Sequence, residues 1–491
     1  MPVRRALSVR DVVSRPDVGG FARAHGVFLV VLMTGLVLRV LTVLGYPCPT
    51  WFGDSATYLG SAVDLTPSLL RPCGYSVLLW LLKPAHSLTL VVIVQHAMGL
   101  AVGVMVYALV WRVARAAGVH RRRRTGPLAG LVAVPVLLDA YLIQLEHLLM
   151  ADEFFIFLTV AAVSVALWGP RPRWWTGAAA GLLMGFGAVT RSVGLPLLVV
   201  LVACLLVRRA GWRPVTAAAV AFAVPLLAYG FWYQSAHGKF ALTNTDQVVL
   251  YGRTVAFAEC AKMKPPPDVA VLCLENLQRD PRIAAPAYQA IWTRSSGFHQ
   301  IPGKLGSDEA NRRAGEFARL AIRTQPGDYA QVVLRDTFRA FGWDREPYPT
   351  PWTVREYTFP AEPKAINGYL AEVAYEYGGS TAAPQVKEPY AGWIRGYQNW
   401  AYVRGTLLGV ILLAGLAGLV LQWRRWGGPA LLPWLTSVAL LVIPAATADF
   451  DYRYVLPALI FATVAAGLAF LRPPKQGADQ PPVDAELSSV L

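Results

Sequence analysis

Long apolar runs recur along this chain and constrain its fold more than any other feature of the sequence. A helix that crosses the hydrocarbon core of a bilayer, about 30 Å thick, needs roughly 20 mostly apolar residues, because it rises about 1.5 Å per residue. Charged residues make up only 15% of the chain, against about 25% in a typical soluble domain. A window of spanning length finds ten runs, at residues 25–46, 88–111, 127–146, 149–168, 174–190, 193–208, 214–233, 405–422, 428–447 and 454–471.

Two of these runs are separated only by Thr190-Arg191-Ser192, so one long bent helix over 174–208 is the alternative to two spans. The first run follows an arginine-bearing leader and lacks the small-residue cleavage site of a signal peptide. We therefore predict that it is retained as the first span.

The positions of the basic residues predict the orientation. With the amino terminus in the cytoplasm, cytoplasmic segments hold 20 Lys and Arg residues, whereas the short outside loops hold four. This asymmetry follows the positive-inside rule and predicts that both termini are cytoplasmic. The basic run at 120–124 is then a topology anchor near anionic lipid, and the net charge of +15 does not indicate a nucleic-acid partner.

The predicted fold class is an all-α polytopic membrane bundle of about ten transmembrane helices, with a mixed or mainly helical outside domain. The large outside segment is long enough for a small domain and contains helix-like stretches at 308–324 and 326–342. The chain divides into a cytoplasmic leader (1–24), a transmembrane core (25–233) with a first outside loop (47–87), an outside domain (234–404), three last transmembrane helices (405–471) and a disordered cytoplasmic tail (472–491).

The five cysteines divide by location. Cys204 lies within a predicted span and is expected to be a buried apolar residue. Cys48 and Cys73 bracket the first outside loop, and Cys260 and Cys273 lie in the large outside segment. An even number of cysteines in an oxidising compartment predicts the disulfides Cys48–Cys73 and Cys260–Cys273, with four free thiols as the alternative.

Charged residues collect at turns on the predicted outer side of the membrane. A charge at the centre of a transmembrane helix costs about 2.5–3.5 kcal/mol, so each such group needs an explanation. The members are Asp54 after the first span, Glu146, Asp152 and Glu153 between the third and fourth, Arg191 between the fifth and sixth, and Asp449, Asp451 and Arg453 before the last.

Each group also has a structural interpretation. Asp54 could cap a short helix, the acids near residue 150 could be loop charges, and Arg453 could pair with a neighbouring aspartate. Arg39 and Asp139 lie at similar depth in the first and third spans, which predicts an intramembrane ion pair. His96 and His147 lack metal-ligand spacing and are expected to be structural.

The functional interpretation takes these groups together. An arginine at the outer membrane surface can hold a lipid-borne phosphate through two hydrogen bonds, and Arg191 and Arg453 are the candidates. A carboxylate in a sheltered loop can take the proton of an acceptor hydroxyl, and Asp54 is the candidate. Lipid phosphate, base and outside location predict sugar transfer from a polyprenyl-phosphate donor.

Several segments resemble the GT-C superfamily of polytopic glycosyltransferases, especially protein O-mannosyltransferases and lipid A aminoarabinose transferases. The resemblance covers about the first two hundred residues and the last forty. Cys73 stands where the family has a second proline, and the first loop has one acid where protein mannosyltransferases have an adjacent pair, which leaves the acceptor class and any metal requirement open. The matching segments are Asp54 with Tyr58, Arg71-Pro72-Cys73-Gly74-Tyr75-Ser76, 148–155, 188–195, and Asp451-Tyr452-Arg453 leading to Pro457.

The resemblance implies a single displacement that inverts the anomeric carbon, with Asp54 as general base and the donor phosphate held by Arg191 and Arg453. It implies that segment 234–404 covers the site and selects a glycan, lipid or protein acceptor. No metal site is predicted, and a divalent cation is left open as a cofactor. The expected location is a bacterial plasma membrane, with the active site extracytoplasmic. The supporting residues would be Tyr58, Arg71, Asp152, Glu153 and Asp451.

Two other classes of protein fit parts of this pattern. A transporter or flippase for a lipid-linked saccharide would also place arginines near lipid phosphate, but it predicts inverted repeats or broken helices at the midplane, and neither is clear in the sequence. A non-catalytic cell-envelope assembly protein of the same fold is the other alternative.

Overall fold

The computed structural model describes residues 18–117, 122–273, 286–293, 296–303, 305–348, 350–425 and 428–471. Every regular element within these segments is an α-helix or a 3-10 helix. Extended backbone pairs only at an isolated bridge between Thr50 and Leu148 in the described part of the chain. The predicted tail 472–491, most of the leader 1–24 and part of the basic run 120–124 lie outside the described residues.

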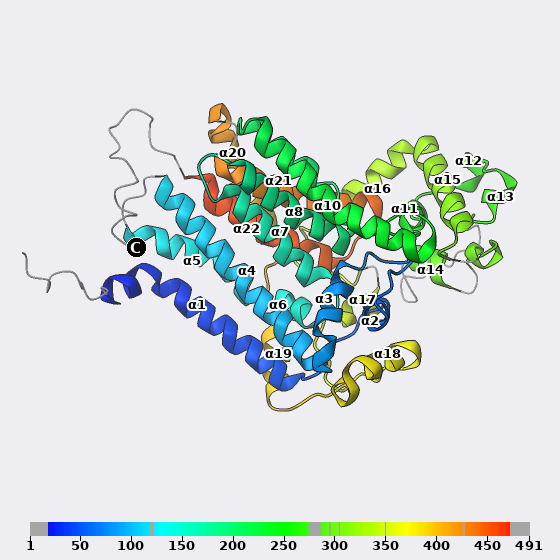
Figure 1. Ribbon diagram of the computed structural model, residues 1–491, viewed down its shortest axis with the longest axis horizontal. Helices are drawn as coiled ribbons and strands as arrows, with labels where there is room; N and C mark the ends of the chain where they lie inside the picture. Colours follow the sequence, from blue (N-terminus) through cyan, green and yellow to red (C-terminus); the bar gives the residue numbers. More distant parts are fainter. Residues whose placement is uncertain are drawn as a thin grey trace, which may run out of the picture.

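Helices occupy the positions of all ten predicted spans (Figure 1). Among the described residues, five helices are long and apolar enough to cross a membrane, or six if the pair α5 and α6, bent by 52°, is one span. The remaining ones are too short for that criterion, so ten spans stay a prediction. The helices are α1 (Val18–Gly45), α4 (Leu88–Ala116), α5 (Arg122–Leu138), α6 (Ala140–His147), α7 (Asp152–Leu167), α8 (Trp174–Thr190), α9 (Leu197–Val207), α10 (Trp212–His237), α20 (Gly405–Leu421), α21 (Leu431–Thr447) and α22 (Tyr452–Ala469).

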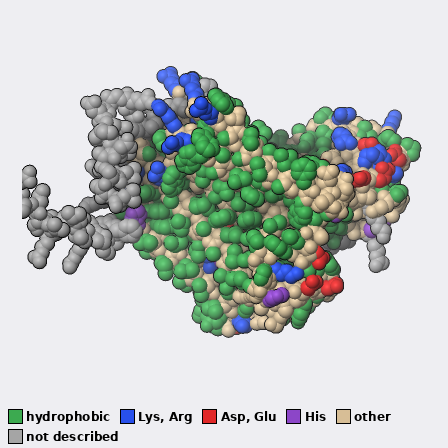
Figure 2. Space-filling model, viewed as in Figure 1, with side chains coloured by type: hydrophobic (Ala, Val, Ile, Leu, Met, Phe, Trp, Pro, Cys, Tyr) green, Lys and Arg blue, Asp and Glu red, His purple; other side chains and the backbone are tan. Residues whose placement is uncertain are grey.

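Large apolar side chains stay exposed on the outer helices of this bundle. Val30 on α1, Val220 on α10 and Leu413 on α20 are each more than 60% exposed. Figure 2 shows hydrophobic side chains spread over the middle of the visible face. Water would disfavour so large a continuous apolar surface, whereas lipid tails accept it. The chain therefore has the surface and the helices of a multi-pass membrane protein.

Two breaks in the backbone shape the bundle. Arg191 has extended backbone angles (φ −145°, ψ 128°) and precedes a 3-10 turn, Ser192–Gly194, so α8 and α9 are two elements rather than one bent helix. Asp139 is also extended, and its carboxylate caps α6 by accepting the N–H groups of Tyr141 at 2.9 Å and Leu142 at 3.2 Å. A third N–H, from Val403, donates to the other oxygen at 2.8 Å.

The predicted ion pair between Arg39 and Asp139 is wrong, because Asp139 is engaged by these backbone groups. Arg39 instead pairs with Glu146, through Nε at 2.7 Å and a second, shorter contact. Both side chains are only 2% exposed. His96 donates its Nδ1–H to the same carboxylate at 2.8 Å, and its Nε2 lies 3.1 Å from Nδ1 of His147, so both histidines belong to one buried hydrogen-bond network.

The segment 234–404 packs in two parts, which Figure 1 shows at the right and at the bottom of the molecule. The first part has its own hydrophobic core around Tyr251, Leu272 and Phe317. The helices predicted at 308–324 and 326–342 are confirmed as α15 and α16. This part contains α11 (Asp246–Thr254), α12 (Cys260–Met263), α13 (Pro267–Ala270), α14 (Pro286–Trp292), α15 (Asp308–Thr324) and α16 (Pro326–Arg339).

The second part covers the first loop and the end of α1. Helix α18 packs on α2, and α19 packs on α1. The core of the whole bundle includes residues of this part, such as Tyr357 and Tyr377, together with residues of the first loop. The elements are α17 (Pro351–Glu356), α18 (Gly368–Gly378) and α19 (Tyr390–Gln398), over α2 (Ser55–Val63) and α3 (Gly74–Leu82) of the first loop.

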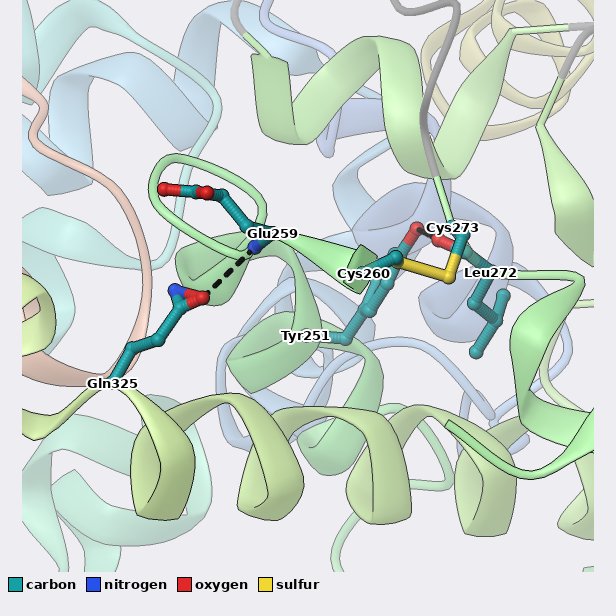
Figure 3. Close-up of a disulfide and its surroundings, with 6 residues drawn as sticks. All are labelled: Tyr251, Glu259, Cys260, Leu272, Cys273 and Gln325. Atoms are coloured by element: carbon teal, nitrogen blue, oxygen red, sulfur yellow. Dashed lines mark hydrogen bonds between the residues drawn. A yellow bond between two sulfur atoms is a disulfide. The ribbon is translucent and has the colours of Figure 1, made fainter. Parts of the chain in front are cut away.

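One of the two predicted disulfides is present. Cys260 and Cys273 are bonded (Figure 3). Cys48 and Cys73 are free and buried, so that prediction is wrong. Helices α2 and α3 place the two thiols in different clusters: Cys48 packs in the main core, whereas Cys73 packs beside Tyr229 and accepts a backbone N–H at 3.1 Å.

Removal of the disulfide is expected to destabilise the first part of segment 234–404. The bond closes a loop with a sequence separation of 13, and loops of about this length contribute about 3 kcal/mol. The variant carrying Cys260→Ala and Cys273→Ala should therefore unfold at lower temperature in detergent, and a reductant should shift the wild type but not the variant. Alkylation of the denatured, non-reduced protein should label three thiols. Labelling of only one thiol would show that Cys48 and Cys73 are bonded after all.

Candidate active site

A cavity of about 610 Å³ lies where the first loop, the turn between α21 and α22, and the segment 234–404 meet. Four of the predicted site residues line it, although they come from opposite ends of the sequence. Figure 1 shows the start of α22 close to α2 and α3, which explains this meeting. The predicted residues at the cavity are Asp54, Arg71, Asp451 and Arg453.

Asp54 lies at the start of α2, but its side chain does not cap that helix. The Ser55 hydroxyl fixes this turn instead, since it accepts the Phe52 N–H and donates to the Leu149 carbonyl, each at 2.9 Å. The Asp54 carboxylate is 19% exposed, and Arg71 donates to it at 3.0 Å. The interpretation of Asp54 as a helix cap is therefore wrong, and its carboxylate lies at the cavity wall instead.

The charge of Asp54 is set by two opposing effects. Burial alone would raise the pKa of this carboxyl group. The guanidiniums of Arg71, Arg453 and Arg191 outweigh burial and hold the pKa below its ordinary value. Asp54 is therefore ionised at neutral pH, which is the state in which it can accept a proton.

Arg453 has an uncommitted donor at the same cavity. Its side chain is 8% exposed, and its Nε lies 3.3 Å from an Asp451 oxygen. The guanidinium lies over the rings of Phe52 at 4.7 Å and Tyr454 at 5.1 Å. Its Nη1 has no hydrogen-bond partner among the described residues. A buried cation with a free N–H group would be satisfied by an anion in the cavity.

Asp451 holds this arginine in place. It caps α22, because its carboxylate accepts the backbone N–H of Arg453 at 3.2 Å. The hydroxyl of Tyr357 donates to its other oxygen at 2.6 Å. Tyr357 in turn stacks on Phe52 with ring centroids 5.5 Å apart. The second part of segment 234–404 therefore positions the side chains at the cavity through α17.

Arg191 lies behind the cavity wall. Its guanidinium lies 5.3 Å from the centre of the Tyr454 ring and forms an ion pair with Asp152. Neither Arg191 nor Asp152 lines the described part of the cavity. The structure thus places the two predicted phosphate-binding arginines near Tyr454, but only Arg453 reaches the cavity wall.

Two supporting residues lie farther back. Tyr58 is 4% exposed and packs edge-on against Tyr75. Burial and the negative charge of Asp54 raise the pKa of Tyr58 to about 12. Glu153 is buried at the start of α7, away from the cavity lining, and its Oε1 has no partner among the described residues. It lies on the side of the Arg39–Glu146 network.

Sequence reasoning missed a buried arginine that anchors the turn before α22. Arg253 on α11 donates to Asp336 on α16 at 2.6 Å and lies 3.8 Å from Asp449. It also donates to the Ala445 carbonyl near the end of α21, at 3.4 Å. Burial raises the pKa of Asp449 against the opposing charge of Arg253. In the sequence, Arg253 and Asp336 are ordinary charges in a polar segment, and no pattern identifies them.

The outer part of the cavity wall is aromatic and was also not predicted. Tyr288 and Trp292 on α14 and Trp352 on α17 line it, and each is between 45% and 49% exposed. Exposed aromatic rings with polar edges bind sugars and lipid chains alike. Within the described segments, no group of three His, Cys, Asp or Glu side chains is placed to hold a metal ion, and a divalent cation stays an untested prediction.

No protein-family model matches this chain, and no curated protein matches it. Two crystal structures of ArnT from Cupriavidus metallidurans are similar to it, one bound to undecaprenyl phosphate and one in the apo state. They are 14% and 15% identical to this chain, cover 90% of it and 77% and 76% of their own length, and have TM-scores of 0.32 and 0.31.

Proposed function

We propose that this chain is a membrane glycosyltransferase that moves a sugar from a polyprenyl-phosphate donor to an acceptor hydroxyl. One observation carries the proposal: an ionised carboxylate, Asp54, and a guanidinium whose Nη1 has no partner among the described residues, Arg453, line the same cavity. The reaction needs a base for the acceptor and a cation for the phosphate that leaves, and this cavity supplies both.

The step is a single displacement. The acceptor oxygen attacks the anomeric carbon while Asp54 takes its proton, so a new carbon–oxygen bond forms. The bond from the anomeric carbon to the phosphate oxygen breaks, and its electron pair stays on the phosphate, where Arg453 stabilises the negative charge. Arg71 keeps Asp54 ionised and turned towards the cavity. The configuration at the anomeric carbon inverts.

Arg191 acts in this proposal as a positioning residue, since Asp152 already pairs with it. It adds positive charge behind Tyr454 without touching the donor. The aromatic wall formed by Tyr288, Trp292 and Trp352 lies on the outside segment, where we place the acceptor. The site is assigned to the extracytoplasmic face with both termini cytoplasmic, as the positive-inside rule predicts. A divalent cation at the donor phosphate is tested by adding a chelator to the transfer assay.

Loss of the Arg453 charge is expected to weaken binding of the lipid phosphate. A hydrogen bond to a charged group contributes about 1.5–3 kcal/mol, so Arg453→Gln should raise the dissociation constant for undecaprenyl phosphate by about 10–100-fold. Binding to the purified protein in nanodiscs is measured by native mass spectrometry. The matched control is Arg323→Gln, which removes an exposed arginine of α15 that does not line the cavity.

An equal loss of affinity in both variants would mean that only net charge matters, and Arg453 would lose its assigned role. A lipid-linked saccharide flippase would bind the donor as tightly but would not release polyprenyl phosphate from it. Release of that lipid from a panel of polyprenyl-phosphate sugars, with membranes as acceptor, therefore separates the transferase from the flippase and from a non-catalytic assembly protein.

A further inference from the structure

A second cavity, of about 820 Å³, lies at the opposite ends of the helices that carry the Asp54 site. Helix α22 starts at Tyr452, next to Arg453 of the Asp54 cavity, and Leu471, just beyond its end, lines the second cavity. The ends of α4, α7 and α9 also line the second cavity, and the two cavities are separated by the length of α22. Nothing in the proposed transfer reaction uses the second cavity.

The charged side chains that line this cavity in the described part of the chain are all basic. Among the described residues, five arginines line it and no carboxylate does, namely Arg112, Arg115, Arg208, Arg209 and Arg424. In the described part of the chain, none of the five forms an ion pair. Figure 2 shows Lys and Arg side chains gathered at the upper left, where Figure 1 places α20. Five uncompensated guanidiniums around one cavity attract an anion.

Two of the arginines serve the protein itself. Arg112 donates to the Trp168 carbonyl at 2.7 Å, and Arg208 donates to the Ala166 carbonyl at 3.1 Å. They satisfy carbonyl groups at the end of α7, where a cation is favoured by the helix dipole. Arg115, Arg209 and Arg424 make no such hydrogen bond among the described residues. Their donors are free for a ligand, and the ordinary orienting role of basic residues does not require them to share a cavity.

The uncharged lining identifies the kind of anion. Trp111 and Trp168 lie beneath Arg115 and Arg112, each with a guanidinium 4.8 Å from its ring. Apolar side chains complete the wall, contributed by Val113, Leu167, Val207 and Leu471. A phosphate among arginines above an apolar wall is the arrangement of a phospholipid headgroup over its acyl chains. A soluble phosphate would use the arginines but not this wall.

We propose that this cavity binds the phosphate headgroup of an anionic phospholipid on the face of the membrane opposite to the Asp54 site. The ligand would place its phosphate against Arg115, Arg209 and Arg424 and its acyl chains along the apolar wall. The proposal stands whether or not the chain is a glycosyltransferase, because none of these residues lies at the Asp54 cavity.

Native mass spectrometry of the full chain in detergent tests this site, with phosphatidylglycerol as the probe and phosphatidylcholine as the neutral comparison. The variant carrying Arg115→Gln, Arg209→Gln and Arg424→Gln should bind phosphatidylglycerol about 100-fold more weakly, since each arginine near anionic lipid contributes about fivefold. The matched control carries Arg171→Gln, Arg173→Gln and Arg213→Gln, three arginines of neighbouring helix ends that do not line the cavity.

An equal loss in the two triple variants would overturn the proposal in favour of a general effect of charge. Full displacement of phosphatidylglycerol by millimolar inorganic phosphate would overturn the lipid assignment and leave a soluble anion as the ligand. If the triple variant does not fold, a photoactivatable phosphatidylglycerol on the wild type decides: crosslinked peptides should contain residues 111–117, 167–170 or 207–209, and their absence among the labelled peptides would contradict the site.

Discussion

The Asp54→Asn variant is expected to lose about 10²–10⁴-fold in transfer rate, the usual contribution of a general base. Asparagine has nearly the same shape as aspartate and can still accept the hydrogen bond from Arg71, so the fold and the cavity should persist. It cannot take a proton from the acceptor hydroxyl. The rate is measured as release of polyprenyl phosphate under single-turnover conditions, which excludes product release as the limiting step.

The chain provides a close control for this experiment. Asp64 ends the same helix α2 that Asp54 precedes, but its side chain is exposed and lies outside the cavity lining. Asp64→Asn should keep the wild-type rate and donor affinity. Asp54→Asn should also keep donor affinity, because Arg453 and not Asp54 holds the phosphate. Full activity of Asp54→Asn would remove Asp54 as the base and favour another acid at the cavity.

The pH dependence follows from the direction of the pKa shift. Asp54 has a pKa below its ordinary value of 3.8, and its catalytic form is the carboxylate. The rate should therefore not fall through protonation of Asp54 between about pH 5 and pH 8, and any loss from this group should appear only at more acid pH. An acid limb with an apparent pKa near 6 that Asp54→Glu shifts would contradict the electrostatic account of the site.

The largest loss of stability is expected for Glu146→Gln. Arg39 and Glu146 are each 2% exposed, and removal of one partner of a buried pair leaves a charge that neither water nor protein solvates. Such changes cost about 3–5 kcal/mol. The Glu146→Gln variant should unfold at much lower temperature in detergent than the wild type, as measured by the loss of the soluble, monodisperse form on heating.

Two further variants identify the cause. Asp139→Asn should be milder, because asparagine still accepts the N–H groups that start α6, and Arg39 keeps its partner. A larger loss of thermal stability in Asp139→Asn than in Glu146→Gln would indicate that Arg39 pairs with Asp139. Replacement of both partners, by Arg39→Met and Glu146→Leu, should recover part of the stability, because no unpaired charge remains in the bundle.

The positions of the helices could be predicted from apolar runs alone, because a membrane helix must present about 20 apolar residues to lipid. The lengths could not. A run of apolar residues does not reveal where the backbone leaves the helix, and the breaks at Asp139 and Arg191 depend on tertiary partners. For the same reason Arg39 was assigned the wrong partner, since similar depth in two spans does not fix which side chains face each other.

Only part of the candidate site could be predicted from the sequence. Asp54, Asp451 and Arg453 stand out as charges at the ends of apolar runs, and such groups need a partner or a function. Arg71 was predicted only from the family resemblance. The contribution of the outside segment did not stand out. Tyr357, Trp352 and Arg253 sit among many polar and aromatic residues there, and only the folded chain shows which of them reach the cavity.

The meeting of Asp54 with Arg453 has a consequence for biosynthesis. Asp54 enters the membrane with the first loop, whereas Arg453 belongs to the last helix, α22, so nearly the whole chain is made in between. At about 5–20 residues per second the interval is on the order of tens of seconds. During that time Asp54 has Arg71 but not the cation assigned to the phosphate. Under the proposed function, a nascent or prematurely ended chain would therefore not act on the donor, and activity would begin only when α22 is inserted.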